Sequence, residues 1–380
     1  MFWEGEMAMH LNRRQWLKTS AIAAAGLIAG SNFPACKRDT SLPQTSLGGE
    51  DYIRLNSNES PYGISENARQ TIIGSIDRSN RYPHRHYSEL EELIAEKENI
   101  SADNIFLGAG STEVMTTLIH LYGIKGETLV ADPTYFDFVY YAKQVDCPLQ
   151  SIPLNDDFEH DLQAMEQRIS PKTSLIYICN PNNPTGSITP GDKLRSFCER
   201  ASQKAVVVVD EAYHEYVEDA AYASMIDLVK EGKKVVVTRT FSKIFGMAGL
   251  RVGYGMARPA IVEDLKRIER NFAPVSWLSL KAAVESYKNV EFTHYAKQKN
   301  KEVKSYLYKE LRRLGLFYVP SHTNFVLFKV KQDSREMFKE FEARNILIRP
   351  FEFNGDYWIR VSLGTIEEMQ TFASALSDFA

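Results

Sequence analysis

Two charged residues lie where apolar, strand-like runs end. Asp210 follows Ala205–Val209, which contains four consecutive valines, and Lys243 follows Val235–Thr238 in a loop that contains Gly246. A carboxylate at the end of a buried strand stays ionised only beside a cation. A lysine in a partly desolvated site loses its proton near neutral pH and attacks carbonyl groups. Taken singly, each residue also has an ordinary role, as a helix cap or as a solvated surface lysine.

Two more strand-like runs end in polar loops. Leu175–Cys179 leads into residues 180–186, whose two prolines and one glycine restrict the backbone. Ile105–Leu107 leads into residues 108–113, where two glycines precede a helical pattern. Glycines before a helix N-terminus expose backbone amides and the positive end of the helix dipole, which favours phosphate binding. Each loop alone is a weak sign, since the first is equally a simple turn.

Together these strand ends predict a site for pyridoxal phosphate (PLP). The carboxyl ends of parallel strands meet at one edge of a sheet, where ligands bind. PLP requires a lysine that forms a Schiff base, a carboxylate that keeps the pyridine nitrogen protonated, and donors for its phosphate. Lys243, Asp210 and the 108–113 loop supply these groups. The cysteines are widely spaced, so no metal site is predicted.

The elements that must position these residues follow an alternating pattern, which predicts an α/β fold with a mostly parallel sheet between helices. The expected strands are 105–107, 129–131, 175–179, 205–209 and 235–238, and the expected helices are 111–122, 136–145, 190–202 and 222–230. A polar helix near 292–314 leads to a smaller α+β domain, with strands at 324–330, 346–349 and 358–362 and helices at 334–344 and 366–379. We therefore predict a large domain at 75–285 and a small domain formed by 51–74 and 286–380.

The motifs jointly resemble the class I and II aminotransferases of PLP fold-type I. The segments that match are Asn183-Pro184-Thr185-Gly186, Asp210-x-Ala212-Tyr213, and Ser242-Lys243 followed by Arg251. Three further segments look like histidinol-phosphate aminotransferase, namely 55–61 (Leu-Asn-Ser-Asn-Glu-Ser-Pro), 81–83 (Arg-Tyr-Pro) and 241–251. The resemblance extends from about Leu55 to the C-terminus. It implies ping-pong amino transfer between an amino acid or amino phosphate and a 2-oxo acid.

The resemblance also implies which residues bind the cofactor. Lys243 would form the Schiff base and move a proton between the substrate and the cofactor. Asp210 would pair with the pyridine nitrogen, Asn183 and Tyr213 would hydrogen-bond the phenolic oxygen, and Tyr135 would stack on the ring. The residues around the phosphate position would be Ala109, Gly110, Ser111, Thr112, Ser242 and Arg251. Lys243, Asp210 and Tyr213 are the expected catalytic residues.

The expected substrate-binding residues come from three segments. Arg360, in Trp-Ile-Arg-Val-Ser, matches the arginine that clamps the α-carboxylate, a task that suits a planar guanidinium. Arg349 matches the arginine that meets the substrate phosphate, and Asn58 lies in the Asn-Glu motif. Tyr82 would reach the phosphate of the neighbouring subunit's cofactor, which implies a homodimer with shared active sites.

The sequence leaves the substrate and the reaction open. The segment before residue 51 lacks the Pro-Tyr pair of histidinol-phosphate enzymes, and residues 273–277 depart from their pattern. Decarboxylases of threonine phosphate and some lyases share the same lysine, aspartate and asparagine, so carbon dioxide release is an alternative to amino transfer. A third hypothesis is an exported, non-catalytic binding protein, against which the retention of Lys243, Asp210 and Arg251 argues.

The N-terminus predicts export. Arg13 and Arg14 precede a short apolar run at 19–30, which resembles a twin-arginine signal and is too short to span a bilayer. We expect a signal at 1–36, a flexible tether at 37–50, passage through the Tat translocase and a periplasmic location. Cys36 is a candidate for lipid attachment. If the signal is not used, the protein stays in the cytoplasm.

Composition and the remaining cysteines add two exclusions. The chain has 380 residues and a net charge of −4, so it lacks the overall positive charge that is typical of nucleic-acid-binding proteins. Cys147, Cys179 and Cys198 are an odd set without close spacing, which argues against a disulfide framework. The resemblance to aminotransferases implies a small amino donor and a 2-oxo acid as partners.

Overall fold

The computed structural model describes residues 52–83, 86–269 and 274–379. The predicted signal, the tether and Cys36 lie outside the described residues. Among the helices that are described, none is long and apolar enough to cross a bilayer.

A seven-stranded sheet forms the centre of the larger part of the molecule. Its strands are β2 (Ile105–Gly108), β3 (Glu127–Asp132), β4 (Leu149–Pro153), β5 (Thr173–Cys179), β6 (Val206–Asp210), β7 (Val235–Thr240) and β8 (Gly253–Ala257). Their spatial order is β2-β8-β7-β6-β5-β3-β4. β8 is antiparallel to both of its neighbours, and every other adjacent pair is parallel. The prediction of a mostly parallel sheet is confirmed.

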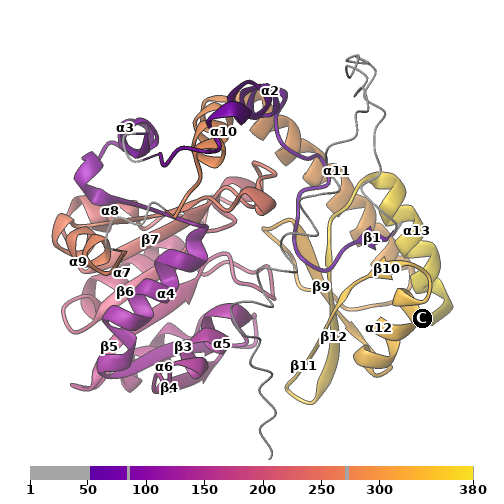
Figure 1. The fold of residues 1–380 in the computed structure, drawn as a ribbon. Coiled ribbons are helices and arrows are strands. Elements are labelled where there is room, and N and C mark those ends of the chain that lie inside the picture. Colours follow the sequence, from indigo (N-terminus) through magenta and orange to yellow (C-terminus); the bar gives the residue numbers. More distant parts are fainter. Residues whose placement is uncertain (1–51, 84–85, 270–273, 380) are drawn as a thin grey trace, which may run out of the picture. The chain divides into compact units, whose positions relative to one another are not determined.

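Helices cover both faces of this sheet, because its strands are apolar on both sides. Val207 and Val209 of β6 belong to one core, whereas Val206 and Val208 belong to the other. The helices of the first core are α2 (Glu66–Ser75), α3 (Tyr87–Glu98), α6 (Leu162–Arg168), α7 (Gly191–Ala201), α8 (Ile226–Lys230) and α10 (Trp277–Lys288). Those of the second core are α4 (Ser111–Leu121), α5 (Phe136–Gln144) and α9 (Pro259–Glu269). Figure 1 shows these layers around the sheet.

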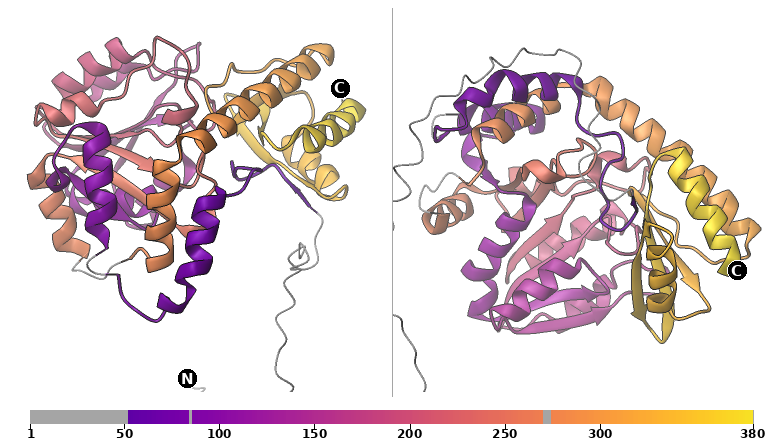
Figure 2. Two further views of the ribbon diagram at one scale, coloured as in Figure 1. Left: turned by 90° about the horizontal axis from the view of Figure 1, so that it is seen from above. Right: turned by 45° about the vertical axis from the view of Figure 1, so that its right-hand side comes forward.

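The C-terminal quarter of the chain forms a smaller α+β part around its own core. A three-stranded antiparallel sheet has the order β11 (Arg349–Phe353), β12 (Asp356–Ser362), β9 (Phe325–Val330). The helices beside it are α11 (Val290–Arg313), α12 (Ser334–Glu342) and α13 (Ile366–Leu376). In the right-hand view of Figure 2, α13 (yellow) lies beside α11 (orange). α11 leads from the larger part of the molecule into this smaller one (Figure 1).

The segment before the large domain is divided between the two parts. β1 (Ile53–Arg54) pairs in parallel with β10 (Ile346–Leu347), whereas α2 packs against α10. The domain boundaries proposed from the sequence remain a prediction. Short 3-10 helices occur at η1 (Ile76–Arg78), η2 (Ala102–Asn104), η3 (Gly123–Lys125), η4 (His214–Tyr216), η5 (Ala248–Leu250) and η6 (Ser377–Phe379).

Two expected elements differ from the structure for identifiable reasons. The strand expected at 346–349 is divided, because β10 pairs with β1 while β11 joins β12. β11 continues through Pro350, which an edge strand accommodates because its outer side needs no donor. The helix expected from Tyr222 begins only at Ile226, since the Glu211 carboxylate accepts hydrogen bonds from Ser224 Oγ and the Met225 N–H.

Candidate active site

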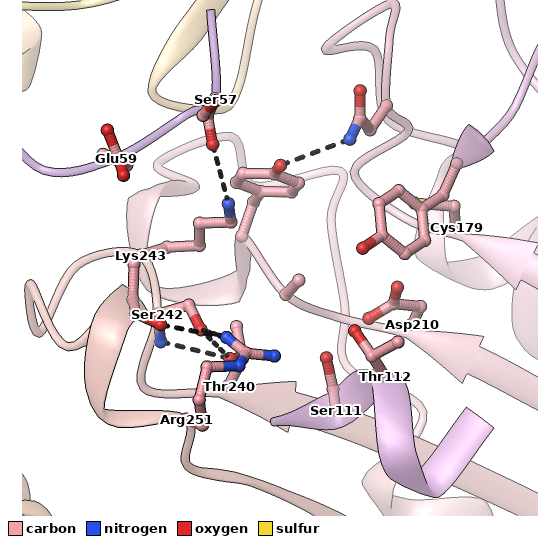
Figure 3. Close-up of a pocket in the computed structure, with 15 residues that line it drawn as sticks. Ser57, Glu59, Ser111, Thr112, Cys179, Asp210, Thr240, Ser242, Lys243 and Arg251 are labelled. Atoms are coloured by element: carbon pink, nitrogen blue, oxygen red, sulfur yellow. Dashed lines mark hydrogen bonds between the residues drawn. The ribbon is translucent and has the colours of Figure 1, made fainter. Parts of the chain in front are cut away.

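Four strand ends meet at one pocket, at the edge of the sheet where the sequence placed the site. β2, β5, β6 and β7 all end beside it, and its volume is about 230 Å³. In Figure 3, Ser111, Ser242 and Arg251 lie at one end of the pocket, and Ser57 and Glu59 lie at the other. The lining residues are Ser57, Glu59, Ser111, Thr112, Tyr135, Cys179, Asn183, Asp210, Ala212, Tyr213, Thr240, Ser242, Lys243, Ala248 and Arg251.

Lys243 extends into the pocket, where backbone oxygens hold its amine. Nζ donates to the carbonyl of Asn58 at 3.2 Å and to the carbonyl of Ser57 at 3.4 Å. Burial, followed by the positive charge of Arg360, lowers the pKa of Lys243 to about 8. A substantial fraction of this amine is therefore neutral and nucleophilic near physiological pH.

Asp210 ends β6 with its carboxylate fully buried. Tyr177 OH donates to Oδ2 at 3.0 Å, and Thr238 Oγ1 donates to Oδ1 at 3.1 Å. Burial raises the pKa of Asp210 to about 6, although these two hydrogen bonds act to lower it. A positively charged N–H group in the pocket would donate to this carboxylate and stabilise its ionised form. Phe138 stacks on the Tyr177 ring at 3.8 Å between centroids and holds it in place.

Tyr213 presents its hydroxyl group to the pocket between two asparagines. Asn58 Nδ2 donates to Tyr213 Oη at 2.9 Å, and Asn183 Nδ2 donates to the same oxygen at 3.5 Å. Burial raises the pKa of Tyr213, so the phenol stays protonated at neutral pH. Its hydrogen is available to a negatively charged or neutral acceptor in the pocket.

The other end of the pocket is suited to an anion. Gly110 is the N-cap of α4 and has φ 85°, and a Cβ at this position would collide with the Arg251 guanidinium. Arg251 Nη1 donates to Ser242 Oγ at 3.3 Å, and Nη2 donates to the Ala109 carbonyl at 3.3 Å. The guanidinium, the two serines that line this end and the first amides of α4 are the donor set that a phosphate group requires.

A second pocket of about 180 Å³ adjoins the first and contains both candidate substrate arginines. Arg349 of β11 lies directly opposite Arg360 of β12 in the sheet register. Arg360 Nη1 donates to Asn183 Oδ1 at 2.6 Å, and Nη2 donates to the Asn56 carbonyl at 2.7 Å. Two of the five N–H donors of the guanidinium form these bonds, so others remain for a substrate anion, and the buried Nε has no hydrogen-bond partner within the described part of the chain.

The structure brings most of the predicted site residues together. Those lining one or both pockets are Asn58, Ser111, Thr112, Tyr135, Asn183, Asp210, Tyr213, Ser242, Lys243, Arg251, Arg349 and Arg360. Ala109 and Gly110 contribute backbone groups beside Arg251. Tyr82 is 79% exposed and does not line either pocket of its own chain.

Several residues of the site had no recognisable sequence signal. Tyr177 lies within an apolar strand, and Thr238 directly follows three valines, so neither indicated a contact with Asp210. Ser362, which holds Asn58, ends the Trp-Ile-Arg-Val-Ser segment that identified Arg360. The strand period could have placed Ser362 on the same face as Arg360, two residues earlier.

The described residues contain no cluster of histidine, cysteine, aspartate and glutamate side chains that could hold a metal ion.

Comparisons with known proteins agree with this geometry. The family model for aminotransferase class I and II matches residues 50–376. A histidinol-phosphate aminotransferase of Moorella thermoacetica is 38% identical over 338 residues, which are 88% of this chain and 87% of the relative. A second, from Caldicellulosiruptor saccharolyticus, is 35% identical over 87% of this chain and 93% of the relative.

Solved structures show the same fold. Histidinol-phosphate aminotransferase of Sinorhizobium meliloti, in complex with pyridoxal-5'-phosphate, has a TM-score of 0.80 and 25% identity, covering 92% of this chain and 98% of that chain. Aspartate aminotransferase of Thermotoga maritima has a TM-score of 0.78 at 20% identity, covering 98% of this chain and 97% of that chain. The prediction of fold-type I architecture is confirmed.

Proposed function

The chain belongs to the class I and II aminotransferases and is a PLP-dependent enzyme, and we propose that it transfers the amino group of histidinol phosphate or a similar amino phosphate to a 2-oxo acid. The observation that carries this proposal is the position of Lys243 and Asp210 in one pocket, adjoined by a second pocket that holds two arginines. The similarity to histidinol-phosphate aminotransferases supports the choice of donor.

The residues of the first pocket fit PLP. Arg251, Ser242, Ser111, Thr112 and the amides that follow Gly110 would hold the phosphate. PLP, when bound, supplies an aldehyde that takes up amino groups and a ring that withdraws electrons from the substrate α-carbon.

The catalytic residues have different roles in the proposed amino transfer. Lys243 would hold the cofactor through its amine, which its lowered pKa leaves partly neutral, and would move the proton at the substrate α-carbon. Asp210 keeps the pyridine nitrogen protonated, because its buried carboxylate is stabilised by a cationic N–H partner. Tyr213 and Asn183 orient the phenolic oxygen, and Tyr135 covers the ring from the pocket wall.

The arginines fix the substrate. Arg360 binds an anionic group of the substrate through guanidinium donors that the protein leaves unused, and Arg349, on the neighbouring strand, binds a second anionic group. Burial lowers the pKa of Arg360 to about 10, which still leaves it charged at neutral pH. Two arginines side by side favour a substrate with a phosphate or a second carboxylate over one with an apolar end.

The test is a half-reaction screen with single amino compounds, which follows loss of the visible absorbance of the bound cofactor. We expect histidinol phosphate to bleach this absorbance and a 2-oxo acid to restore it. Arg349→Met should lower the affinity for histidinol phosphate without abolishing bleaching by alanine. Bleaching by ordinary amino acids alone would contradict the proposed donor. Release of carbon dioxide without any need for a 2-oxo acid would identify a decarboxylase instead.

The enzyme acts as a homodimer with shared active sites in this proposal. Tyr82 is exposed and outside its own pocket, as expected of a side chain that reaches the cofactor phosphate of the neighbouring subunit. Ile73 and Ile76, which are also more than half exposed, add an apolar surface close to Tyr82 in the chain.

The N-terminal sequence supports export by the Tat translocase to the periplasm. Arg13 and Arg14 before a short apolar run are the supporting feature, and Cys36 is the candidate anchor. Replacement of both arginines by lysine would leave the protein in the cytoplasm, and Cys36→Ser would release it from membranes in fractionated cells. Unchanged fractionation of both variants would argue against export and anchoring.

A further inference from the structure

Asn58 connects the C-terminal part of the molecule to Tyr213 of the larger part. It is 1% exposed and has φ 55°, a left-handed conformation that asparagine tolerates better than most residues. Its N–H donates to Ser362 Oγ at 2.8 Å, and its carbonyl accepts from Asn324 Nδ2 at 3.0 Å. These bonds fix the Asn58 backbone from the C-terminal part of the molecule.

The backbone N–H of Asn58 can only donate, and this fixes the directions of the hydrogen bonds that the Asn58 side chain makes. The Asn58 N–H occupies Ser362 Oγ, so the Ser362 hydrogen turns to Asn58 Oδ1, 3.2 Å away. The amide oxygen therefore faces Ser362, and Nδ2 faces Tyr213. The alternative amide orientation would place two donors on the Ser362 oxygen and leave the Ser362 hydrogen without the Asn58 Oδ1 acceptor.

Asn183 is oriented in the same way from the other side. The Arg360 guanidinium has only donors, and its Nη1 lies 2.6 Å from Asn183 Oδ1. Asn183 Nδ2 must then face Tyr213, at 3.5 Å. The Tyr213 oxygen thus accepts from two amide groups, and its own hydrogen is directed into the pocket that Tyr213 lines.

Building on the proposed function, we propose that Asn58 is a positioning residue, which with Ser362 forces the Tyr213 hydroxyl group to act as a donor to the phenolic oxygen of the cofactor. We name the path from the Asn58 N–H through Ser362 Oγ and the Asn58 side chain to Tyr213 the Asn58 relay. Without it, Tyr213 could turn its hydrogen to a neighbouring side chain and leave the phenolic oxygen without this donor. A donor at that oxygen stabilises its charged form and lowers the apparent pKa of the bound cofactor.

Asn58→Asp tests the relay, because a carboxylate has the same shape, tolerates the left-handed backbone and can only accept. Tyr213 would then donate to residue 58, and the apparent pKa read from the visible absorbance should rise by about one unit, the size of one lost hydrogen bond. The added negative charge also raises this pKa. The substitution is therefore repeated in Tyr213→Phe, where there is no hydroxyl group to redirect.

We expect the rise caused by Asn58→Asp to be at least twice as large with Tyr213 present as in Tyr213→Phe. Asn56→Asp is the matched control, since Asn56 lines the adjoining pocket and its Oδ1 has no hydrogen-bond partner among the described residues. It adds a charge two residues away and should shift the pKa equally in both backgrounds. Equal rises for Asn58→Asp in both backgrounds would overturn the relay.

Ser362→Ala provides the same comparison if Asn58→Asp does not fold. It removes the hydroxyl group that orients the Asn58 amide without adding a charge, so we expect a smaller rise that disappears in Tyr213→Phe. No rise in either background would overturn the relay. A wild-type protein without a visible cofactor band would instead refute the proposed function, and with it the relay, whereas a normal band with unchanged pKa values refutes the relay alone.

Discussion

The reactivity of Lys243 arises from burial and from the cations around it. Its amine lies against two backbone carbonyls, and no carboxylate within the described residues forms an ion pair with it. Burial and the Arg360 charge shift its pKa from 10.5 to about 8. The same amine in an exposed lysine would be almost entirely protonated at pH 7.

The first prediction concerns the rate at which cofactor-free protein takes up PLP. Only the neutral amine attacks the aldehyde, so the rate should rise about tenfold per pH unit below pH 8 and level off above it. Stopped-flow absorbance between pH 6 and about 10 measures this rate, with N-acetyl-lysine as a control for the titration of PLP itself. A midpoint near 10.5, or a rate that does not vary with pH, would contradict the account.

The second prediction concerns Asp210→Asn, which should lower turnover by roughly 100-fold or more, as removal of a preorganised electrostatic partner does. Because the folded-state pKa of about 6 exceeds the ordinary 3.8, protonation of Asp210 favours folding. This contribution is complete below pH 3.8 and is lost as the pH rises through 6.

Cofactor-free Asp210→Asn should therefore be more stable than wild type at pH 8, by up to about 3 kcal/mol for a two-unit shift. Urea unfolding of both proteins at pH 8 and pH 4.5 measures the difference, which should shrink at the lower pH. A variant that is less stable than wild type at pH 8 would show that the hydrogen bonds from Tyr177 and Thr238 outweigh the cost of burying the charge.

At the scale of secondary structure, the loop between β2 and α4 packs closely against Arg251 at the anion end of the pocket. Gly110 has a positive φ, and a Cβ at this position would collide with the Arg251 guanidinium, which would have to move. Both conditions restrict this position to glycine.

The third prediction is that Gly110→Ala raises the dissociation constant for PLP about tenfold or more, because strain and displacement of Arg251 each cost on the order of 1 kcal/mol. Fluorescence titration of the cofactor-free protein measures it. Gly249→Ala is the matched control, since a Cβ there meets nothing within 4 Å and the loop is the one that carries Arg251. Equal affinity of the two variants would show that the loop adapts without cost.

The sequence predicted the elements whose hydrophobic pattern was continuous. β5, β6 and β7 were expected because both of their faces are buried, and their ends gave the positions of Asp210 and Lys243. β8 (Gly253–Ala257) and β4 (Leu149–Pro153) were not expected, since glycines interrupt the first and the second is a half-exposed edge strand. The contact between Asn58 and Tyr213 could not be predicted, because it depends on how two distant loops meet.

At the scale of the whole molecule, the fourth prediction tests the shared active site. Lys243→Ala and Tyr82→Ala chains are co-expressed in equal amounts with different tags. Each hybrid dimer would have one site with both defects and one site with neither, so random pairing should restore about a quarter of the wild-type sites. Activity equal to the mean of the two separate homodimers would contradict sharing.

The long separation in sequence between the residues of this site has a consequence for timing. Ser362, close to the end of the 380 residues, closes the contact to Asn58 across 304 positions, and β1 pairs with β10 across a similar span. A nascent chain cannot form these contacts until residues 346–362 have left the ribosome, and long-range pairing is slow. The contacts that hold Asn58 are therefore expected to form late, after the strands that position Asp210 and Lys243 have left the ribosome.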